Sequence, residues 1–438
     1  MKTTLFPQLT LFLLVTLQSS TLKANDIGMI DLAQALSKKQ LVSNVLNANP
    51  QLEVALATWQ AALANIDQQS SFDDPQFQYS FAPLTANSYQ ANGQKADFGQ
   101  KFEVSQKLPF PGKLDLRAKS AAFHAETKQH NITSLQLLLA STAKSLFADW
   151  YFIHQAILIN QQQQQLSKEL VDVAINQYST GKINKQTVLQ TKGQLAQVNH
   201  HAISLMRQKK TRQAQLNTLL NRPVDSPLAK PQPLSNITDL PTLKQLQIFA
   251  MQSRPELKAI SANIKGYQSA TDLATLAYYP DLKLSVGYNT LWDNQDKRFN
   301  IGIGINIPLS QSKRRAAEQQ AKAYSQQANW QQIDLQAKIK QELAINHANT
   351  EEALHVLQLY HQQLLPLANE KLATVKTDFQ SGKASYLDLI RAKKSKLQTQ
   401  LEAEQALTNL HRHFAALEQA VGSIAPLSAL TFTGINAE

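Results

Sequence analysis

The sequence predicts an α+β membrane protein in which a small antiparallel sheet is joined to very long helices. Residues 299–309 alternate strictly between apolar and small or polar side chains, which is typical of a β-strand. Residues 113–178 contain neither proline nor glycine and carry apolar side chains every three or four positions, which predicts a helix about 100 Å long. The turn Thr180-Gly181-Lys182 recurs as Ser381-Gly382-Lys383, about 200 residues later, so the same order of elements is used twice.

One face of the strand at residues 299–309 is wholly apolar. A tilted strand of about ten residues is long enough to cross a bilayer as part of a barrel, so we expect this face to contact lipid. The side chains assigned to lipid are Phe299, Ile301, Ile303, Ile305 and Ile307. The opposite face carries Asn300, Gly302 and Gly304, and we expect Gly302→Ser to be tolerated there. The alternative is an edge or sandwich strand of a water-soluble domain.

The same alternation predicts three further strands and two hairpins. In the first hairpin, residues 76–109, Phe77, Tyr79 and Phe81 alternate with polar residues, and a second alternating run follows a polar loop at 84–96. In the second hairpin, residues 281–309, an alternating run from Leu282 is followed by a polar turn at 293–297.

Long helices occupy most of the remaining chain. We expect a helical region at 31–71 with a break at Asn49-Pro50, and a helical hairpin at 113–220. A second helical hairpin is expected at 311–421, with a kink at Pro366. Helices of this length bury their apolar stripe only in a coiled coil or a bundle.

These patterns divide the chain into five parts. Residues 1–24 are typical of a secretory signal peptide, since Lys2 precedes an apolar run that is too short to span a bilayer as a helix. Residues 25–221 form the first repeat and 242–425 the second. Residues 222–241 are a proline-rich linker, and 426–438 are a C-terminal tail. No later stretch is long and apolar enough to be a transmembrane helix.

Composition narrows the classes of function. The chain has 438 residues, of which only 17% are charged, and its net charge is +11. It has no cysteine, which excludes disulfides, thiolate metal sites and cysteine nucleophiles. The positive charge indicates acidic partners, with lipid phosphates among them. Nucleic acid is not expected, because the basic residues are dispersed and no motif of aromatic and basic residues accompanies them.

Four strands with one apolar face cannot form a closed barrel alone, since the smallest membrane barrels need about eight. Open sheet edges are not stable in lipid. The chain must therefore associate, with 12 strands from three copies or 8 strands from two. A helical hairpin follows each β-hairpin, so each copy also adds helices to a tube that continues the barrel. The pattern alone predicts a channel.

Several motifs resemble those of the TolC-like outer membrane efflux proteins, the exit ducts of tripartite pumps. They are the run QKLPFPGKLDLRA at 106–118 and the turns YSTGKINKQTVL at 178–189 and FQSGKASYLDLIRA at 379–392. The resemblance covers nearly all of the mature chain. It implies a trimer with a 12-stranded barrel in the outer membrane, continued by a long periplasmic coiled-coil tunnel. The internal tandem repeat is inferred from the repeated order of elements in the sequence itself.

The resemblance also implies partners and sites. The partners are lipid of the outer membrane, a periplasmic adaptor protein and an inner membrane transporter. The form LPFPGK is most similar to members that serve metal-exporting pumps of the resistance-nodulation-division type, so metal ions or drugs are the implied substrates. No cofactor is implied. The tip residues that would meet the adaptor are Gly181, Lys182, Gly382 and Lys383, and the aperture residues are Asp388 and Arg391. The alternatives are a secretion channel or pump-independent porin, and a periplasmic coiled-coil scaffold.

Other candidate sites are weak. Glu352 and His355 have the spacing of a di-iron ligand pair, but the second pair and the further glutamates that such a site needs are missing. His411 and His413 point to different faces of a helix, and we expect both to be solvated. No catalytic arrangement stands out, so the protein is not expected to be an enzyme. Basic clusters begin both long helices, and we expect them to lie near anionic lipid headgroups: Lys113, Arg117 and Lys119, and Lys313, Arg314 and Arg315.

Overall fold

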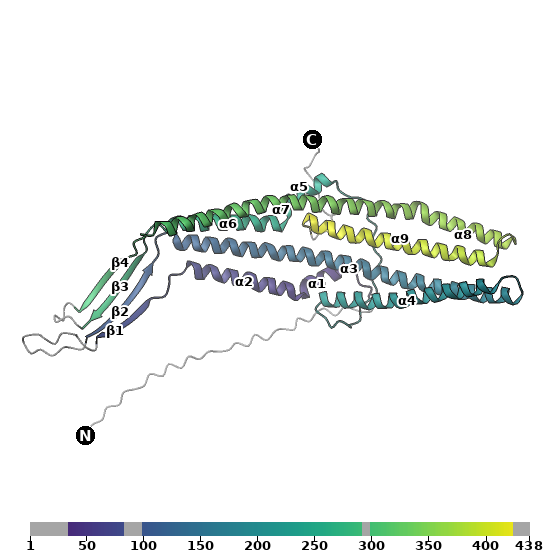
Figure 1. The fold of residues 1–438 in the computed structure, drawn as a ribbon, viewed down its shortest axis with the longest axis horizontal. Coiled ribbons are helices and arrows are strands. Elements are labelled where there is room, and N and C mark those ends of the chain that lie inside the picture. The colour runs from purple at the N-terminus through teal and green to yellow at the C-terminus, as the bar shows by residue number, and fades with distance from the viewer. Residues whose placement is uncertain (1–33, 83–98, 291–297, 424–438) are drawn as a thin grey trace, which may run out of the picture.

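The computed structural model describes residues 34–82, 99–290 and 298–423 as an elongated molecule with a sheet at one end and long helices at the other (Figure 1). The segments predicted as a signal peptide (1–24), a polar loop (84–96), a polar turn (293–297) and a C-terminal tail (426–438) lie outside the described residues. The first half contains α1 (Lys38–Ala48), α2 (Pro50–Ser70), β1 (Gln76–Ala82), β2 (Gly99–Leu108), α3 (Lys113–Ser179) and α4 (Lys185–Leu219).

The second half has the same order of elements. It contains α5 (Leu243–Ser253), α6 (Pro255–Leu276), β3 (Leu282–Asn289), β4 (Phe299–Ile305), α7 (Gln311–Leu359), a π-helical turn (Tyr360–Leu364), α8 (Leu365–Gln380) and α9 (Tyr386–Val421). Each short helix is followed by a proline at the first position of the next helix, where the missing N–H has no partner to lose: Pro50 begins α2 and Pro255 begins α6.

The four strands form one antiparallel sheet in the order β1-β2-β3-β4. Residues directly opposite each other on neighbouring antiparallel strands share a face, so the register decides whether the apolar faces join. They do, because Val104 is opposite both Phe77 and Val286, and Val286 is opposite Ile301. The strand predicted at 299–309 is shorter than expected: β4 ends at Ile305, and Ile307 lies beyond it.

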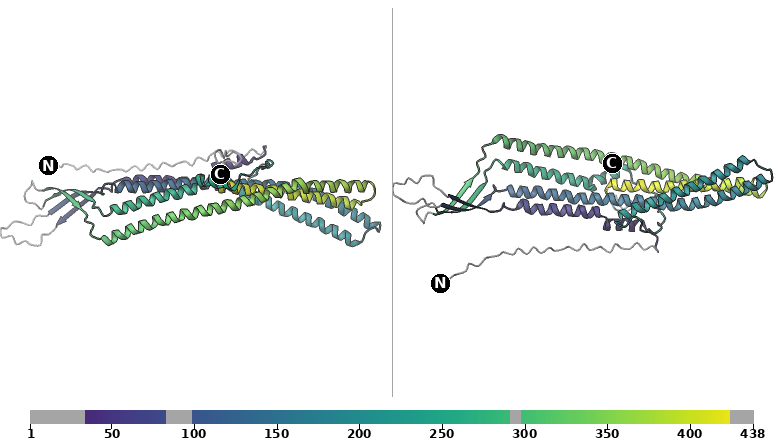
Figure 2. Two further views of the ribbon diagram at one scale, coloured as in Figure 1. Left: turned by 90° about the horizontal axis from the view of Figure 1, so that it is seen from above. Right: turned by 60° about the horizontal axis from the view of Figure 1, so that its bottom comes forward.

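Helix α3 is 67 residues long and runs from the sheet to the far end of the molecule (Figures 1 and 2). On the sheet side it packs against α2 and α6, and towards the far end it packs against α4 and α9. Helix α7 contacts α6 and then α9, and α8 continues it beside α9. Two antiparallel helix pairs therefore form the distal part of the molecule. Among the described residues, none of the helices combines the length and the hydropathy that a membrane-spanning helix requires.

The largest apolar core lies near the middle of the long helices, where the short helix α1 packs. It contains Leu41, Val45, Phe147, Trp150 and Leu216, all at most 1% exposed. A second core lies where α5 packs against α7 and α9, around Leu246, Leu343 and Leu417.

The proline-rich linker at 222–241 is packed along these cores rather than extended into solvent. The N–H of Leu36 donates to the carbonyl of Lys230, and the N–H of Gln232 donates to the carbonyl of Leu36, both at 2.8 Å. The indole Nε1 of Trp150 donates to the carbonyl of Ala229 at 3.0 Å. We call residues 222–241 the strap, because this segment is hydrogen-bonded both to Leu36, just before α1, and to α3 and so holds these two helices together.

The kink expected at Pro366 takes the form of a π-helical turn. Proline has no N–H and cannot donate to the carbonyl of the preceding turn, so a regular α-helix cannot pass through it without local rearrangement. The five residues Tyr360–Leu364 adopt π-helical hydrogen bonding just before Pro366. The irregularity therefore separates α7 from α8 without breaking the helical path.

Candidate functional site

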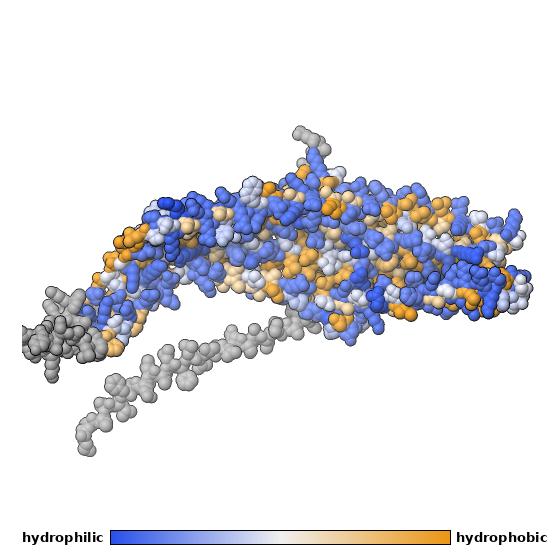
Figure 3. All heavy atoms as spheres, viewed as in Figure 1, coloured by the Kyte–Doolittle hydropathy of each residue, from blue (hydrophilic) through white to orange (hydrophobic). Residues whose placement is uncertain are grey.

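One face of the sheet is apolar and exposed to its surroundings. Ile301 is 83% exposed, and every side chain of the set assigned to lipid at the sequence level is at least 57% exposed in the single chain. The apolar rows run across all four strands: Phe77, Val104, Val286 and Ile301 form one row, and Tyr79, Phe102, Tyr288 and Phe299 form the next. Figure 3 shows patches of hydrophobic surface at the sheet end of the molecule. A continuous apolar surface of this kind requires a partner or a lipid environment.

The opposite face is polar, and the space available for a side chain differs between its glycine positions. A side chain at Gly302 would have its Cβ 2.5 Å from the Oγ of Ser285, so that hydroxyl would have to rotate away, and the expectation that Gly302→Ser is tolerated far better than Ile303→Asp stays a prediction. At Gly304 the nearest atom to such a Cβ is the Cβ of Lys283 at 3.6 Å, an ordinary contact. Glu103 forms ion pairs with Lys101 at 2.6 Å and with Lys283 at 3.9 Å across this face.

The two outer strands, β1 and β4, have one edge each without a strand partner in the described chain. Such an edge presents unsatisfied N–H and carbonyl groups that readily pair with another chain. The same sheet therefore carries an exposed apolar face and, among the described residues, two edges without a strand partner.

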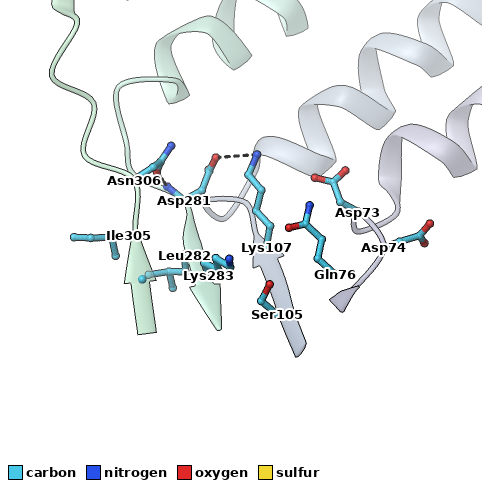
Figure 4. A pocket seen from close by; sticks show the side chains of 11 residues that line it. Asp73, Asp74, Gln76, Ser105, Lys107, Asp281, Leu282, Lys283, Ile305 and Asn306 are labelled. Atoms are coloured by element: carbon cyan, nitrogen blue, oxygen red, sulfur yellow. Dashed lines mark hydrogen bonds and ion pairs between the residues drawn. The ribbon is translucent and has the colours of Figure 1, made fainter. Parts of the chain in front are cut away.

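An ion pair between Lys113 and Asp281 fixes the sheet to the helices. The Nζ of Lys113 donates to the Oδ1 of Asp281 at 2.7 Å and to the carbonyl of Tyr279 at 2.9 Å, while the N–H of Phe110 donates to the same Oδ1 at 2.9 Å. Figure 4 shows Asp281 at the rim of a pocket of about 430 Å³, which Lys107 and Lys283 also line. The pocket lies on the polar side of the sheet, at the end where β1 and β3 begin and β2 and β4 end.

The basic cluster that begins α3 is therefore only partly available to headgroups. Lys113 is 7% exposed and is buried against Asp281, so its charge is already paired within the chain and is not presented to a headgroup. Arg314 at the start of α7 behaves similarly, since its Nε donates to the carbonyl of Ala277 at 2.8 Å. Lys313 and Arg315 are exposed, so the expectation remains a prediction for them. Both long helices use a basic side chain to bind the segment that precedes β3.

The two helical turns have the same construction at Gly181 and Gly382. Their φ angles are +72° and +74°, in the left-handed region where a Cβ is costly. The N–H of Lys182 donates to the carbonyl of Gln177 at 2.8 Å, and that of Lys383 donates to the carbonyl of Asp378 at 2.7 Å. These are the hydrogen bonds of a Schellman C-cap. Both turns lie at the end opposite the sheet (Figures 1 and 2), as the sequence predicts.

Asp388 and Arg391 do lie close together at the start of α9. The Nη1 of Arg391 is 3.5 Å from the Oδ1 of Asp388, and both side chains are about half exposed or more. Asp388 also accepts hydrogen bonds from the Oγ of Ser385 at 2.6 Å and from its N–H at 3.2 Å. These bonds, more than the charge of Arg391, hold the pKa of Asp388 below its usual range. The pattern Ser-x-x-Asp is a capping box, a signal that was present in the sequence.

His411 is buried, so the prediction that it is solvated is wrong. It is 4% exposed, and its Nε2 is 2.9 Å from the carbonyl of Ser235 in the strap. Burial and the nearby charge of Lys38 lower its pKa to about 4, although the hydrogen bond to Ser235 opposes the shift. Within the described ranges, no group of three or more acidic or histidine side chains has the arrangement of a metal site, and the pair Glu352 and His355 gains no partners.

The family model described as outer membrane efflux protein matches residues 41–222 and 249–423. No curated protein sequence matches the chain. Among solved structures, the chain is similar to the outer membrane protein VceC from Vibrio cholerae, with 18% identity and a TM-score of 0.73 over 88% of this chain and 96% of that one. It is also similar to the MtrE outer membrane channel of Neisseria gonorrhoeae, with 16% identity and a TM-score of 0.72 over 88% and 89%. The CmeC outer membrane channel of Campylobacter jejuni gives 15% identity and a TM-score of 0.69 over 88% and 85%.

Proposed function

Because the chain belongs to the outer membrane efflux protein family, we propose how its copies assemble into an efflux duct. The protein is an outer membrane channel, the passive exit duct of a tripartite efflux system. Its helices extend from the membrane into the periplasm. Substrate arrives from an inner membrane transporter and a periplasmic adaptor, and the duct itself supplies a path rather than chemistry.

Three copies close one 12-stranded barrel in this proposal. The observation that carries it is the exposed apolar face of a four-stranded sheet whose two outer edges have no strand partner among the described residues. Pairing β4 of one copy with β1 of the next satisfies both edges and places the apolar rows on the outside, against lipid. Two copies would give eight strands, but trimers are the form that the family implies. The repeated order of elements supports a tandem duplication as its origin.

The helical tips meet the periplasmic adaptor and form the aperture. Gly181 and Gly382 lie at the end farthest from the sheet, and Lys182 and Lys383 are exposed beside them. Threefold symmetry would gather three copies of Asp388, with its partner Arg391, around one opening. The transporter is of the resistance-nodulation-division type in this proposal, and the form of the LPFPGK segment favours metal ions over drugs as substrate.

Cells that lack this protein provide the test. Deletion should raise the intracellular content of metal ions or drug-like dyes, and the intact gene should restore export. A photoreactive residue at Lys182 or Lys383 should cross-link the channel to a periplasmic protein in the same cells. A channel that conducts but never cross-links would instead support a pump-independent porin or secretion channel. Recovery of the protein as a monomer in the soluble periplasmic fraction would refute the membrane duct and support the scaffold.

A further inference from the structure

Positive charge is concentrated at the distal ends of the helices. We define the basic tip as residues 168–192 and 370–396, which include the ends of α3 and α8 and the starts of α4 and α9. These two short segments contain eleven Lys or Arg residues and five Asp or Glu residues, a net charge of +6 in a chain whose total is +11. More than half of the net charge therefore lies in a small part of the chain, at one end of the molecule.

The basic side chains of the tip are exposed and largely without acidic partners. Eight of the eleven are exposed: Lys168, Lys182, Lys185, Lys192, Lys371, Lys376, Lys383 and Arg391. Within the described part of the chain, Arg391 is the member of the eleven that forms an ion pair, with Asp388. Stabilisation of the helix ends does not explain why all of these basic residues are present. Lys185, for example, is the first residue of α4, where a positive charge opposes the helix dipole.

A groove with a mixed lining runs along the same end. It lies between α3, α8 and α9 and has a volume of about 440 Å³. Leu166, Leu372 and Leu397 give it apolar walls, and Lys393 and Lys396 lie along one side. A groove of this kind fits an amphipathic helix, whose apolar residues enter it while acidic residues on its flank meet the lysines.

We propose that the basic tip docks a helical segment of the periplasmic partner whose contacting face carries Asp and Glu residues. This rests on the proposed function, which places the partner at the tips, and it adds the chemistry by which that partner is chosen. Charge complementarity speeds association and excludes partners of the wrong sign, and salt weakens it. Lipid of the outer membrane is not the favoured occupant, because the 67 residues of α3 separate the tip from the sheet by about 100 Å.

The test uses the full channel in nanodiscs of phosphatidylcholine, with two synthetic amphipathic helices as probes. Both peptides have leucine on one face, and the other face is glutamate in one and lysine in the other. In the tip variant, Lys182, Lys383, Lys393 and Lys396 are changed to Glu. In the control variant, four exposed basic residues outside the tip are changed to Glu: Lys39, Arg207, Lys210 and Lys340. The two variants therefore carry the same change in net charge.

We expect the acidic peptide to bind the unchanged channel and the control variant with equal affinity. Its affinity for the tip variant should be at least about tenfold lower. Raising NaCl from about 50 to about 500 mM should remove most of the difference. Equal binding of both peptides, or an equal loss in both variants, would overturn the proposal. So would tip-dependent binding of phosphatidylglycerol vesicles without binding of the acidic peptide. Trimer formation and conductance are measured on the same samples. If the unchanged protein neither forms a trimer nor conducts, the proposed duct is refuted rather than the docking proposal.

Discussion

Ile303→Asp places a carboxylate on the apolar face of β4. The next residue, Gly304, lies on the opposite face of the strand and serves as its control. Ile303 is 75% exposed in the single chain and lies opposite Leu284, so it contacts lipid if the sheet closes into a barrel. Arg or Lys on a lipid face costs about 2–4 kcal/mol at the bilayer centre and an acid somewhat less. Loss of the contact between the isoleucine side chain and lipid adds about 1.5–3 kcal/mol. The total of about 3–5 kcal/mol applies to each of three copies, so the trimer should be strongly destabilised.

The control is Gly304→Asp, one residue away on the polar face. Its Cβ has room, and the new carboxylate lies opposite Lys283, where opposite charges are favourable. The assay is the fraction of protein that migrates as an SDS-resistant trimer in outer membrane extracts as temperature rises. We expect Ile303→Asp to lose the trimer at a much lower temperature than Gly304→Asp. Equal loss, or greater loss in Gly304→Asp, would refute the assignment of the two faces.

Three further predictions concern the helical part. Gly181→Val or Gly382→Val should reduce efflux but leave the SDS-resistant trimer intact, because a left-handed φ costs a β-branched residue about 1–2 kcal/mol locally. Asp388→Ala should shift the reversal potential of the channel in a planar bilayer towards anion preference, and Arg391→Ala should shift it towards cation preference. His411 has a pKa of about 4 in the folded chain, so the unfolded chain binds a proton first as pH falls from about 6.5, and stability falls by about 2 kcal/mol at pH 5. His411→Gln should remove that part of the pH dependence of the thermal midpoint.

Each of these has a control and a contrary outcome. Gly193→Val, on the exposed side of α4 with no neighbour near its Cβ, should leave efflux unchanged. Normal efflux from both Gly181→Val and Gly382→Val would argue against docking at the tips. Unchanged reversal potentials would remove Asp388 and Arg391 from the aperture. His200→Gln, at an exposed histidine, should keep the full pH dependence, and an unaltered slope in His411→Gln would mean that another group causes it.

Local patterns predicted the features that depend on neighbouring residues. The alternation around Ile301 gave its strand and its apolar face, since side-chain direction in a strand follows from sequence position alone. The turns at Gly181 and Gly382 were readable because each follows a long helical pattern, and glycine with a positive φ angle is the usual residue at such a helix end. The end of β4 was less predictable, because the pattern continues to Leu309 although strand pairing stops at Ile305.

Features that depend on distant contacts were not predictable in this way. Lys113 looks like a solvated helix residue until the fold places Asp281 beside it, 168 positions away. His411 is buried because the strap crosses α9 at Ser235, which no helical period indicates. The capping role of Asp388 differs, since the pattern Ser-x-x-Asp was readable and identifies a structural function for a residue also assigned to the aperture.

Cross-linking between the outer strands tests the closed trimer most directly, because the chain has no cysteine of its own. The variant Tyr79→Cys and Ile301→Cys carries one thiol on β1 and one on β4, the two outer strands of the sheet. After treatment of membranes with a bifunctional thiol reagent, denaturing gels should show monomer, dimer and trimer, and nothing larger. Either cysteine alone should give no such ladder, since β1 of one copy lies beside β4 of the next. A ladder that stops at the dimer, continues past the trimer or never forms would contradict a 12-stranded barrel of three copies.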